Sequence, residues 1–325
     1  MDVDPFEQIT GQERARRLLR GQIDSGRVAH AYLLVGEHGL GKTLLARALA
    51  QSLLPEAALD RHPDFWEDLR NSHLSLDEIR LMPSRPPTHH RHTLQQFLSW
   101  RPALGARRVA LVRGLQRTDQ NLQSMVLKTL EEPHPGQVII LTAPSLNPFV
   151  VLPTLVSRCQ QVHCHALPDA QVEALLRTRG AGPEQATSLA RLARGRPGWA
   201  LRALSDPELA RLQTDWQASL DRVFGAPADV ALRLAAEIDQ ESQRWRAQRR
   251  TEDEGLGEAQ EDPAQAAVRA FQLGLRRRMM DAPAPQSAGF AELLQASYET
   301  LGHLEQNVSA RLTLEVFLLR CRLVS

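Results

Sequence analysis

The sequence is poor in lysine and cysteine and has no long apolar run. Arginine supplies every basic side chain except Lys42 and Lys128, a bias that we attribute to coding preference rather than to function. The three cysteines are Cys159, Cys164 and Cys321. They contain no C-x-x-C pair, which excludes the disulfide framework of a small secreted protein. No apolar run approaches the ~20 residues of a membrane-spanning helix, so the sequence predicts a protein that does not cross a membrane.

An excess of one sign of charge is also missing. The formal net charge is +1, so the molecule as a whole does not attract nucleic acid or an anionic membrane, and any DNA contact must be local. The acidic opening Met-Asp-Val-Asp-Pro has no apolar core, which is unlike a secretory signal. Together with the cysteine usage, it favours a cytoplasmic protein. A length of 325 residues, with 42% hydrophobic and 24% charged residues, suits two or three globular domains.

A phosphate-binding loop is the most specific motif present. Residues 36–43 read GEHGLGKT, a complete G-x-x-x-x-G-K-T. In such a loop backbone N–H groups surround phosphates, the lysine meets the β- and γ-phosphates, and the threonine meets the metal ion. The expected nucleotide-binding residues are Gly36, Gly39, Gly41, Lys42 and Thr43. The loop stands between an apolar run at 31–35 and a helical pattern at 42–54, which favours binding of ATP or ADP. A loop that folds correctly and binds nothing remains an alternative.

The acid that a hydrolytic enzyme of this type needs is missing from its expected place. A second apolar strand, 108–112, should be followed by a carboxylate that holds the metal ion and polarises water. Arg113 and Gly114 stand there instead. Glu131 and Glu132 are better explained as acids at a helix terminus before a proline. The sequence therefore predicts no independent ATP hydrolysis.

Two further polar residues near the expected site have competing explanations. Asp119 is best explained as a residue at the N-terminus of a helix. Thr142 ends an apolar strand and could contact phosphate, as a polar residue does there in relatives, with a turn-forming threonine as the alternative. Neither residue replaces the missing carboxylate.

The pattern of apolar residues predicts an α/β fold followed by helices. Strands are expected at 31–35, 108–112 and 137–142, and helices at 7–27, 42–54, 76–82, 94–100 and 121–130. Strands that alternate with helices indicate a parallel, doubly wound sheet. From about residue 166 only helices are expected, at 170–179, 184–194, after 198, 207–224 and 229–248. Asp229 is expected to be an N-cap, and 251–262 a polar flexible loop.

Metal binding is not favoured. Two groups have the residue types of metal ligands: His89, His90 and His92, and Cys159, His163, Cys164 and His165. The histidine group lacks a fourth ligand. In the second group, alternation along a strand sends neighbouring side chains to opposite faces. The basic run 276–278 is interpreted as a helix face, with a partner contact as the alternative.

Three blocks of sequence resemble the AAA+ clamp-loader subunits of bacterial DNA polymerase III. They are HAYLLVG at 30–36, LKTLEEP at 127–133, and Ser157-Arg158-Cys159. The resemblance covers about residues 6–205, and 304–315 is weakly similar to the collar of the family. It implies a RecA-like AAA+ domain at 1–165, a small helical lid at 166–206, and an all-helical collar at 207–325.

Where the chain departs from the family pattern, it resembles the stator-type (delta-prime) subunits rather than the motor subunits. Motor subunits have acids where this chain has Arg113-Gly114, and a lid arginine where it has Gly198. The resemblance implies that Arg158 acts as an arginine finger on the nucleotide of a neighbouring subunit. The implied partners are the motor subunits and the delta subunit, and, through the complex, the sliding clamp and primed DNA.

Other features limit what the resemblance implies. Many relatives carry four zinc-binding cysteines in the region 51–70, where only His62 remains here, so no structural zinc is expected. Arg158 has an alternative explanation as a solvated arginine at the entrance to a strand. A self-sufficient ATPase that uses an unorthodox acid and a scaffold that binds no nucleotide are the alternative functions.

Overall fold

The chain divides into two compact units, with the boundary between Leu204 and Ser205. A computed structural model describes residues 4–68, 76–84, 87, 92–115, 118, 120–148, 150–249, 262–305 and 309–324. Within these ranges no helix combines the length and apolar character that crossing a membrane requires. The division into three domains, at 1–165, 166–206 and 207–325, remains a prediction.

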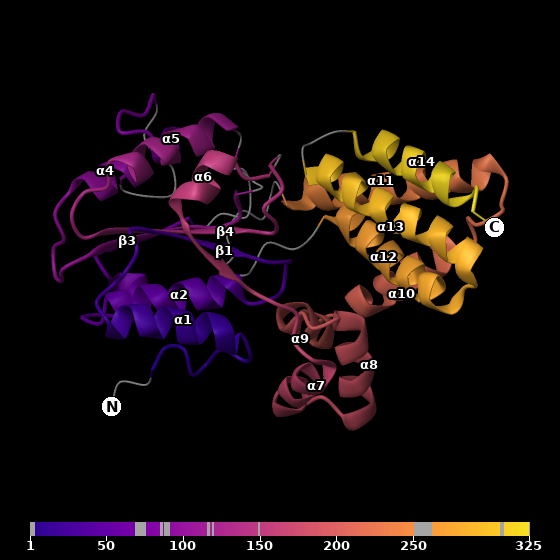
Figure 1. Cartoon of the computed structure of the whole chain (residues 1–325), viewed down its shortest axis with the longest axis horizontal. Coiled ribbons are helices and arrows are strands. Elements are labelled where there is room, and N and C mark those ends of the chain that lie inside the picture. Colours follow the sequence, from indigo (N-terminus) through magenta and orange to yellow (C-terminus); the bar gives the residue numbers. More distant parts are fainter. Residues whose placement is uncertain are drawn as a thin grey trace. The chain divides into compact units, whose positions relative to one another are not determined.

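A five-stranded sheet forms the centre of the first unit (Figure 1). Its strands are β1 (Ala31–Val35), β2 (Phe65–Glu67), β3 (Arg108–Val112), β4 (Gln137–Ala143) and β5 (Gln160–His163). The order is β2-β3-β4-β1-β5, and every neighbouring pair is parallel. The parallel α/β sheet expected from the sequence is confirmed. Strands β1, β3 and β4 are buried along their whole length, which is why they are continuous apolar runs.

Helices cover both faces of this sheet (Figure 1). The helical segments are α1 (Glu13–Asp24), α2 (Lys42–Leu53), η1 (Leu59–Arg61), α3 (Leu76–Ile79), α4 (Leu94–Ser99), α5 (Gln120–Glu131) and α6 (Pro153–Arg158). Leu34 of β1 packs in the core formed with α1 and α2, and Leu33 packs in the core formed with α4, α5 and α6. Adjacent strand residues thus feed two separate cores, as the two-residue period of a strand requires.

Two helices of this unit differ from the prediction. Helix α1 begins at Glu13 rather than at residue 7, because Gln12 has left-handed backbone dihedrals, with φ of 56°, and residues 5–8 form a turn. Helix α3 ends at Ile79 rather than at residue 82. The strand β2 was not predicted. It has three residues, which is too few for an alternating pattern to be recognised.

Three helices complete the first unit: α7 (Asp169–Thr178), α8 (Pro183–Ala193) and α9 (Pro197–Ser205). Proline occupies the first turn of α8, where its missing N–H costs nothing. The all-helical character predicted after residue 166 is confirmed.

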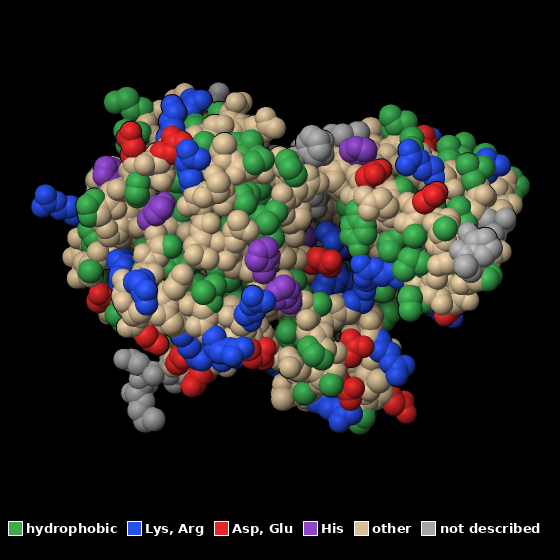
Figure 2. All heavy atoms as spheres, in the orientation of Figure 1, with side chains coloured by type: hydrophobic (Ala, Val, Ile, Leu, Met, Phe, Trp, Pro, Cys, Tyr) green, Lys and Arg blue, Asp and Glu red, His purple; other side chains and the backbone are tan. Residues whose placement is uncertain are grey.

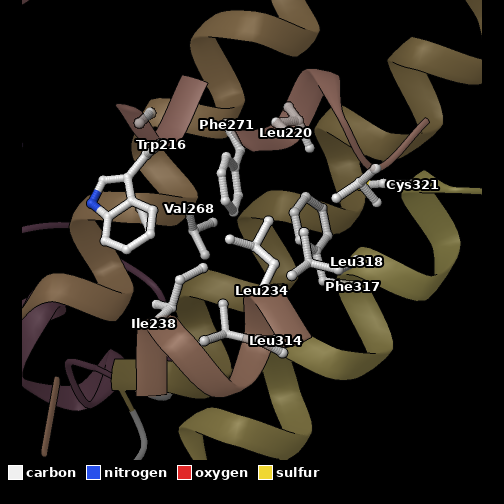
Figure 3. Close-up of a cluster of buried hydrophobic side chains, with 14 of the residues drawn as sticks. Trp216, Leu220, Leu234, Ile238, Val268, Phe271, Leu314, Phe317, Leu318 and Cys321 are labelled. Atoms are coloured by element: carbon white, nitrogen blue, oxygen red, sulfur yellow. The ribbon is translucent and has the colours of Figure 1, made fainter. Parts of the chain in front are cut away.

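In its described residues, the second unit contains helices and no strand: α10 (Pro207–Asp221), α11 (Ala228–Arg249), α12 (Pro263–Asp281), α13 (Ala284–Glu305) and α14 (Ala310–Cys321). Its core is drawn in Figure 3, where Leu234, Phe271 and Phe317 point toward one another from α11, α12 and α14. The rings of Phe271 and Phe317 are stacked, with centroids 6.3 Å apart.

Two sequence interpretations in this unit are wrong. Asp229 is not an N-cap: α11 begins one residue earlier, and the Asp229 carboxylate pairs with Arg233 at 2.6 Å. Asp262 does not belong to a polar loop, because it is buried and accepts a hydrogen bond from the N–H of Ala264 as the N-cap of α12. The remainder of that predicted loop, 251–261, lies outside the described residues.

The basic run in α12 is a helix face, as predicted. Arg276 bonds the Tyr298 hydroxyl, and Arg278 pairs with Asp221 at 2.6 Å. Arg277 is exposed. On the face drawn in Figure 2, basic and acidic side chains lie interspersed over both units. The partner contact considered for this run stays a prediction.

Candidate functional site: the phosphate loop and its neighbours

The phosphate loop leaves the sheet between β4 and β5, at the carboxyl end of β1. The N–H of Gly36 donates to the carbonyl of Ala143, and Gly41 precedes α2 with a φ of 86°. Lys42 is 6% exposed. Its ammonium donates to the carbonyl oxygens of Gly36 and Glu37, at 2.6 and 2.8 Å. The expected loop is therefore folded as a compact turn before α2, with Thr43 half-buried beside Lys42.

At two positions of the loop, neighbouring backbone atoms come so close that only glycine fits. A Cβ on Gly36 would lie 2.6 Å from the carbonyl oxygen of Cys164, and one on Gly39 would lie 2.9 Å from the backbone nitrogen of Trp199. Both glycines also have positive φ angles, 153° and 82°, which favour glycine. The loop thus touches the residue that follows β5 on one side and the first turn of α9 on the other. The N–H of Gly198 donates to the Gly39 carbonyl.

A buried glutamine that the sequence analysis missed ties three segments together beside the loop. The Gln12 amide donates to the carbonyls of Leu40 and His165, at 3.2 and 2.7 Å. Its side-chain oxygen accepts from the N–H of His165 at 2.9 Å. Such contacts reach far along the chain and leave no periodic signal in the sequence. The one local signal in the sequence is the neighbouring Gly11, a residue type that often marks a change of backbone direction.

The positively charged side chain of Arg113 lies at the end of β3, where ATP hydrolysis would need a carboxylate. Arg113 is buried, and its Nε donates to the carbonyl oxygen of Asp68 at 2.6 Å. The same Nε lies 3.8 Å from a Glu67 carboxylate oxygen, and Glu67 also pairs with Arg47 of α2. Burial raises the pKa of Glu67, an effect that the charges of Arg47 and Arg113 partly offset. Glu67 is the last residue of β2, and it pairs with one arginine from α2 and one that follows β3.

Thr142 lies inside β4 and not in a turn, so its turn-forming alternative is wrong. It is 3% exposed, and its hydroxyl accepts a hydrogen bond from the N–H of Gly114 at 2.8 Å. This bond joins the end of β4 to the residues that follow β3. Thr142 thus stands on the strand next to β1, in register with Leu34. Asp119 lies outside the described residues.

Arg158 lies between a helix and a strand, as the last residue of α6 and two residues before β5. Its side chain is 39% exposed. One terminal nitrogen of the guanidinium pairs with Glu131 at 2.8 Å. The other donates to the carbonyl of Thr154 at 3.2 Å. Glu131 is the final residue of α5, as its helix-terminal interpretation predicts.

Among the described residues considered as metal ligands, the rings of His163 and His165 are stacked with centroids 6.4 Å apart, and the two cysteines lie apart. Cys159 and Cys164 pack in the cores on opposite faces of the sheet, and burial raises the pKa of the Cys159 thiol to about 12. The ring of His62 is buried, accepts from the N–H of Asp64 and faces Glu56. Across the residues that the structure describes, no three potential ligands form a metal-binding group. His89 and His90 lie outside those residues.

The strand order, the phosphate loop after β1 and the helices after β5 define a RecA-like P-loop protein of the AAA+ class. Residues 11–168 match the family described as DNA polymerase III, delta subunit. Over that segment, the chain is similar to the AAA+ clamp-loader subunits of DNA polymerase III.

Two curated subunits of DNA polymerase III are similar to part of the chain. The chain is 31% identical over 206 residues to DNA polymerase III subunit delta' of Pseudomonas aeruginosa, covering 54% of this chain and 56% of that one. It is 32% identical over 172 residues to subunit tau of Salmonella typhimurium, covering 51% of this chain and 26% of the relative. A gamma subunit-related protein of Thermotoga maritima has a solved structure with a TM-score of 0.43 and 19% identity, covering 96% and 99% of the two chains. The matched part of the chain spans little more than half the length of the delta' subunit and about a quarter of the length of the tau subunit.

Proposed function

We propose that this chain is a stator-type (delta-prime) clamp-loader subunit that does not hydrolyse ATP by itself. In this role it occupies one end of an open ring with the motor subunits and the delta subunit. The complex opens a sliding clamp and places it on primed DNA. The chain contributes Arg158 to a nucleotide bound by a neighbouring subunit.

The observation that carries the proposal is the buried arginine at the end of β3. Hydrolysis needs a carboxylate there to hold the metal ion and orient water. Arg113 has the opposite charge, and its bond to the Asp68 carbonyl fixes the guanidinium in place. A second cation beside a metal–phosphate site would repel the metal ion. The nearby Glu67 is an unsuitable substitute, because its pairing with Arg47 would have to be broken before it could bind a metal ion.

The exposure of Arg158 supports its role in trans. An arginine finger must reach the phosphates of another chain, so its guanidinium has to be accessible and fixed in direction. Arg158 ends the short helix α6 on the surface, and both terminal nitrogens are bonded to groups of its own chain. A planar guanidinium held in this way can donate its other N–H groups to phosphate oxygens.

ATP turnover by the purified chain, alone and mixed with motor subunits, delta subunit, clamp and primed DNA, tests the proposal. We expect no turnover by the chain alone and DNA-stimulated turnover in the mixture. We expect Arg158→Ala to lower that turnover by about 10³-fold or more at the site that it serves. Robust turnover by the isolated chain that Lys42→Ala abolishes would establish the self-sufficient ATPase instead.

A scaffold that binds no nucleotide is the second candidate, and one observation favours it. The Lys42 ammonium bonds the carbonyls of its own loop, and the Gly198 N–H bonds the Gly39 carbonyl. Two of the three N–H donors of the ammonium are thereby engaged within the loop. Failure of the folded chain to bind a fluorescent ATP analogue would favour this candidate and leave the stator role of Arg158 intact.

A further inference from the structure

Helices α5 and α6 each supply one hydrogen-bond acceptor that anchors the Arg158 guanidinium. Glu131, at the end of α5, accepts from one terminal nitrogen at 2.8 Å. The carbonyl of Thr154, one turn earlier in α6, accepts from the other at 3.2 Å. These anchors come from different elements, so they fix both the position and the plane of the guanidinium. Packing of α5 against α6 brings them together.

Glu131 stands where helix stability gives no reason for an acid. The C-terminus of a helix carries a partial negative charge, which disfavours carboxylates and favours cations. Arg158 fits that rule at the end of α6, whereas Glu131 breaks it at the end of α5. The side chain of Glu131 is 43% exposed, so it also contributes little to packing. Its contact with Arg158 is the feature that distinguishes it from the adjacent exposed acid, Glu132.

We propose that Glu131 is the positioning residue for Arg158, a role that rests on the proposed trans function of that arginine. An arginine has five N–H donors in a rigid plane. The bonds to Glu131 and Thr154 use one on each terminal nitrogen. Nε–H and one N–H on each terminal nitrogen are then directed away from these anchors and can reach phosphate oxygens of a neighbour. Glu131 thereby reduces the rotational freedom that the long side chain would lose when it meets the nucleotide.

The expected effect is moderate, because ion pairs between exposed groups are weak. Glu131→Ala is expected to lower the kcat of the reconstituted complex about two- to fivefold and to leave the KM for ATP unchanged. Arg158 still exists in this variant and reaches the phosphate less often. The KM stays constant because the neighbour's phosphate loop binds the nucleotide.

The experiment measures DNA-stimulated ATPase rates of complexes reconstituted with five forms of this chain: wild type, Glu131→Ala, Arg158→Ala, the double variant and Glu132→Ala. Glu132→Ala is the matched control, since it removes an acid one residue away. We expect Glu132→Ala to behave as wild type and the double variant to match Arg158→Ala. Glu131→Gln, which keeps the side-chain shape and an accepting oxygen, replaces Glu131→Ala if that variant fails to assemble.

Several outcomes would overturn the positioning role. A rate that rises in Glu131→Ala would mean that Glu131 restrains Arg158 instead of presenting it. If Glu131→Ala lowers the ATPase rate by the same factor with and without Arg158, Glu131 acts through another residue. If Arg158→Ala lowers the rate and Glu131→Ala does not, the positioning role alone is wrong. If Arg158→Ala leaves the rate intact, the proposed trans function itself is wrong.

Discussion

The backbone N–H of Gly198 donates a hydrogen bond to the carbonyl oxygen of Gly39, at 2.8 Å. This bond joins the first turn of α9 to the middle of the phosphate loop. The approach is close, because the backbone nitrogen of Trp199 lies 2.9 Å from where a Cβ on Gly39 would be. The shape of the loop and the position of α9 therefore depend on each other.

Replacing Gly39 with alanine is expected to separate the loop from α9. The new methyl group would clash with Trp199, and alanine at a φ of 82° is strained by about 1–2 kcal/mol. Gly41→Ala is the matched control. Gly41 has a φ of 86°, and among the described residues nothing beyond its chain neighbours lies within 4 Å of where its Cβ would be. Thermal unfolding of the two variants should show a lower Tm for both, with the larger decrease for Gly39→Ala. Equal decreases would mean that the contact with α9 adds nothing to stability.

Lysine substitution tests whether the loop binds nucleotide. The chain has two lysines, Lys42 in the loop and Lys128 exposed on α5. We expect millimolar ATP with magnesium to raise the Tm of the wild type, because a ligand that binds only the folded state stabilises it. Lys42→Ala should abolish that increase, and Lys128→Ala should keep it. No increase in the wild type, despite correct folding, would indicate the nucleotide-free scaffold.

The sequence predicted those features that are written in a few consecutive residues. Residues 36–43 identified the phosphate loop, and buried parallel strands such as β1 were recognisable as apolar runs. Contacts between distant segments were not predictable. The roles of Gln12, Arg113 and Glu131 depend on the atoms that their side chains reach, and these come from other strands and helices. Arg158 was recognised through Ser157 and Cys159, but its ion pair with Glu131 required the packing of α5 and α6.

Glu67 is expected to make stability depend on pH in a direction opposite to that of most paired carboxylates. Burial raises its pKa above 4.5 in the folded state, so the folded chain holds this proton more tightly than the unfolded chain does. The resulting stabilisation is complete below pH 4.5 and is lost as the pH rises through the raised pKa. Glu67→Gln does not titrate. The Tm of the wild type minus that of Glu67→Gln should therefore decrease as the pH rises over this range.

Glu132→Gln provides the control for a change of net charge at the surface. The decrease expected for the Glu67 pair is measured against this control. A wild-type advantage that grows with pH would contradict the prediction, because it would mean that Arg47 and Arg113 favour the charged form of Glu67 more than burial disfavours it.

Asp262 is expected to contribute more to stability than an ordinary N-cap. It shares one arrangement with Asp206: each aspartate precedes a proline at the start of a helix and accepts from an N–H in the first turn. Asp206 is exposed, so Asp206→Ala should cost about 1 kcal/mol, the usual value of a cap. Asp262 is buried and also bonds the hydroxyl of Ser242 and the guanidinium of Arg246. Asp262→Ala would leave the buried hydroxyl of Ser242 without this acceptor, so the total cost should reach about 2–4 kcal/mol. Urea unfolding of the full chain, with hydrogen exchange of the amides in α10–α14 as the probe, compares the two variants within one unit. Equal costs would show that the bonds to Ser242 and Arg246 add nothing beyond the cap, and that α11 and α12 are held together by their apolar core alone.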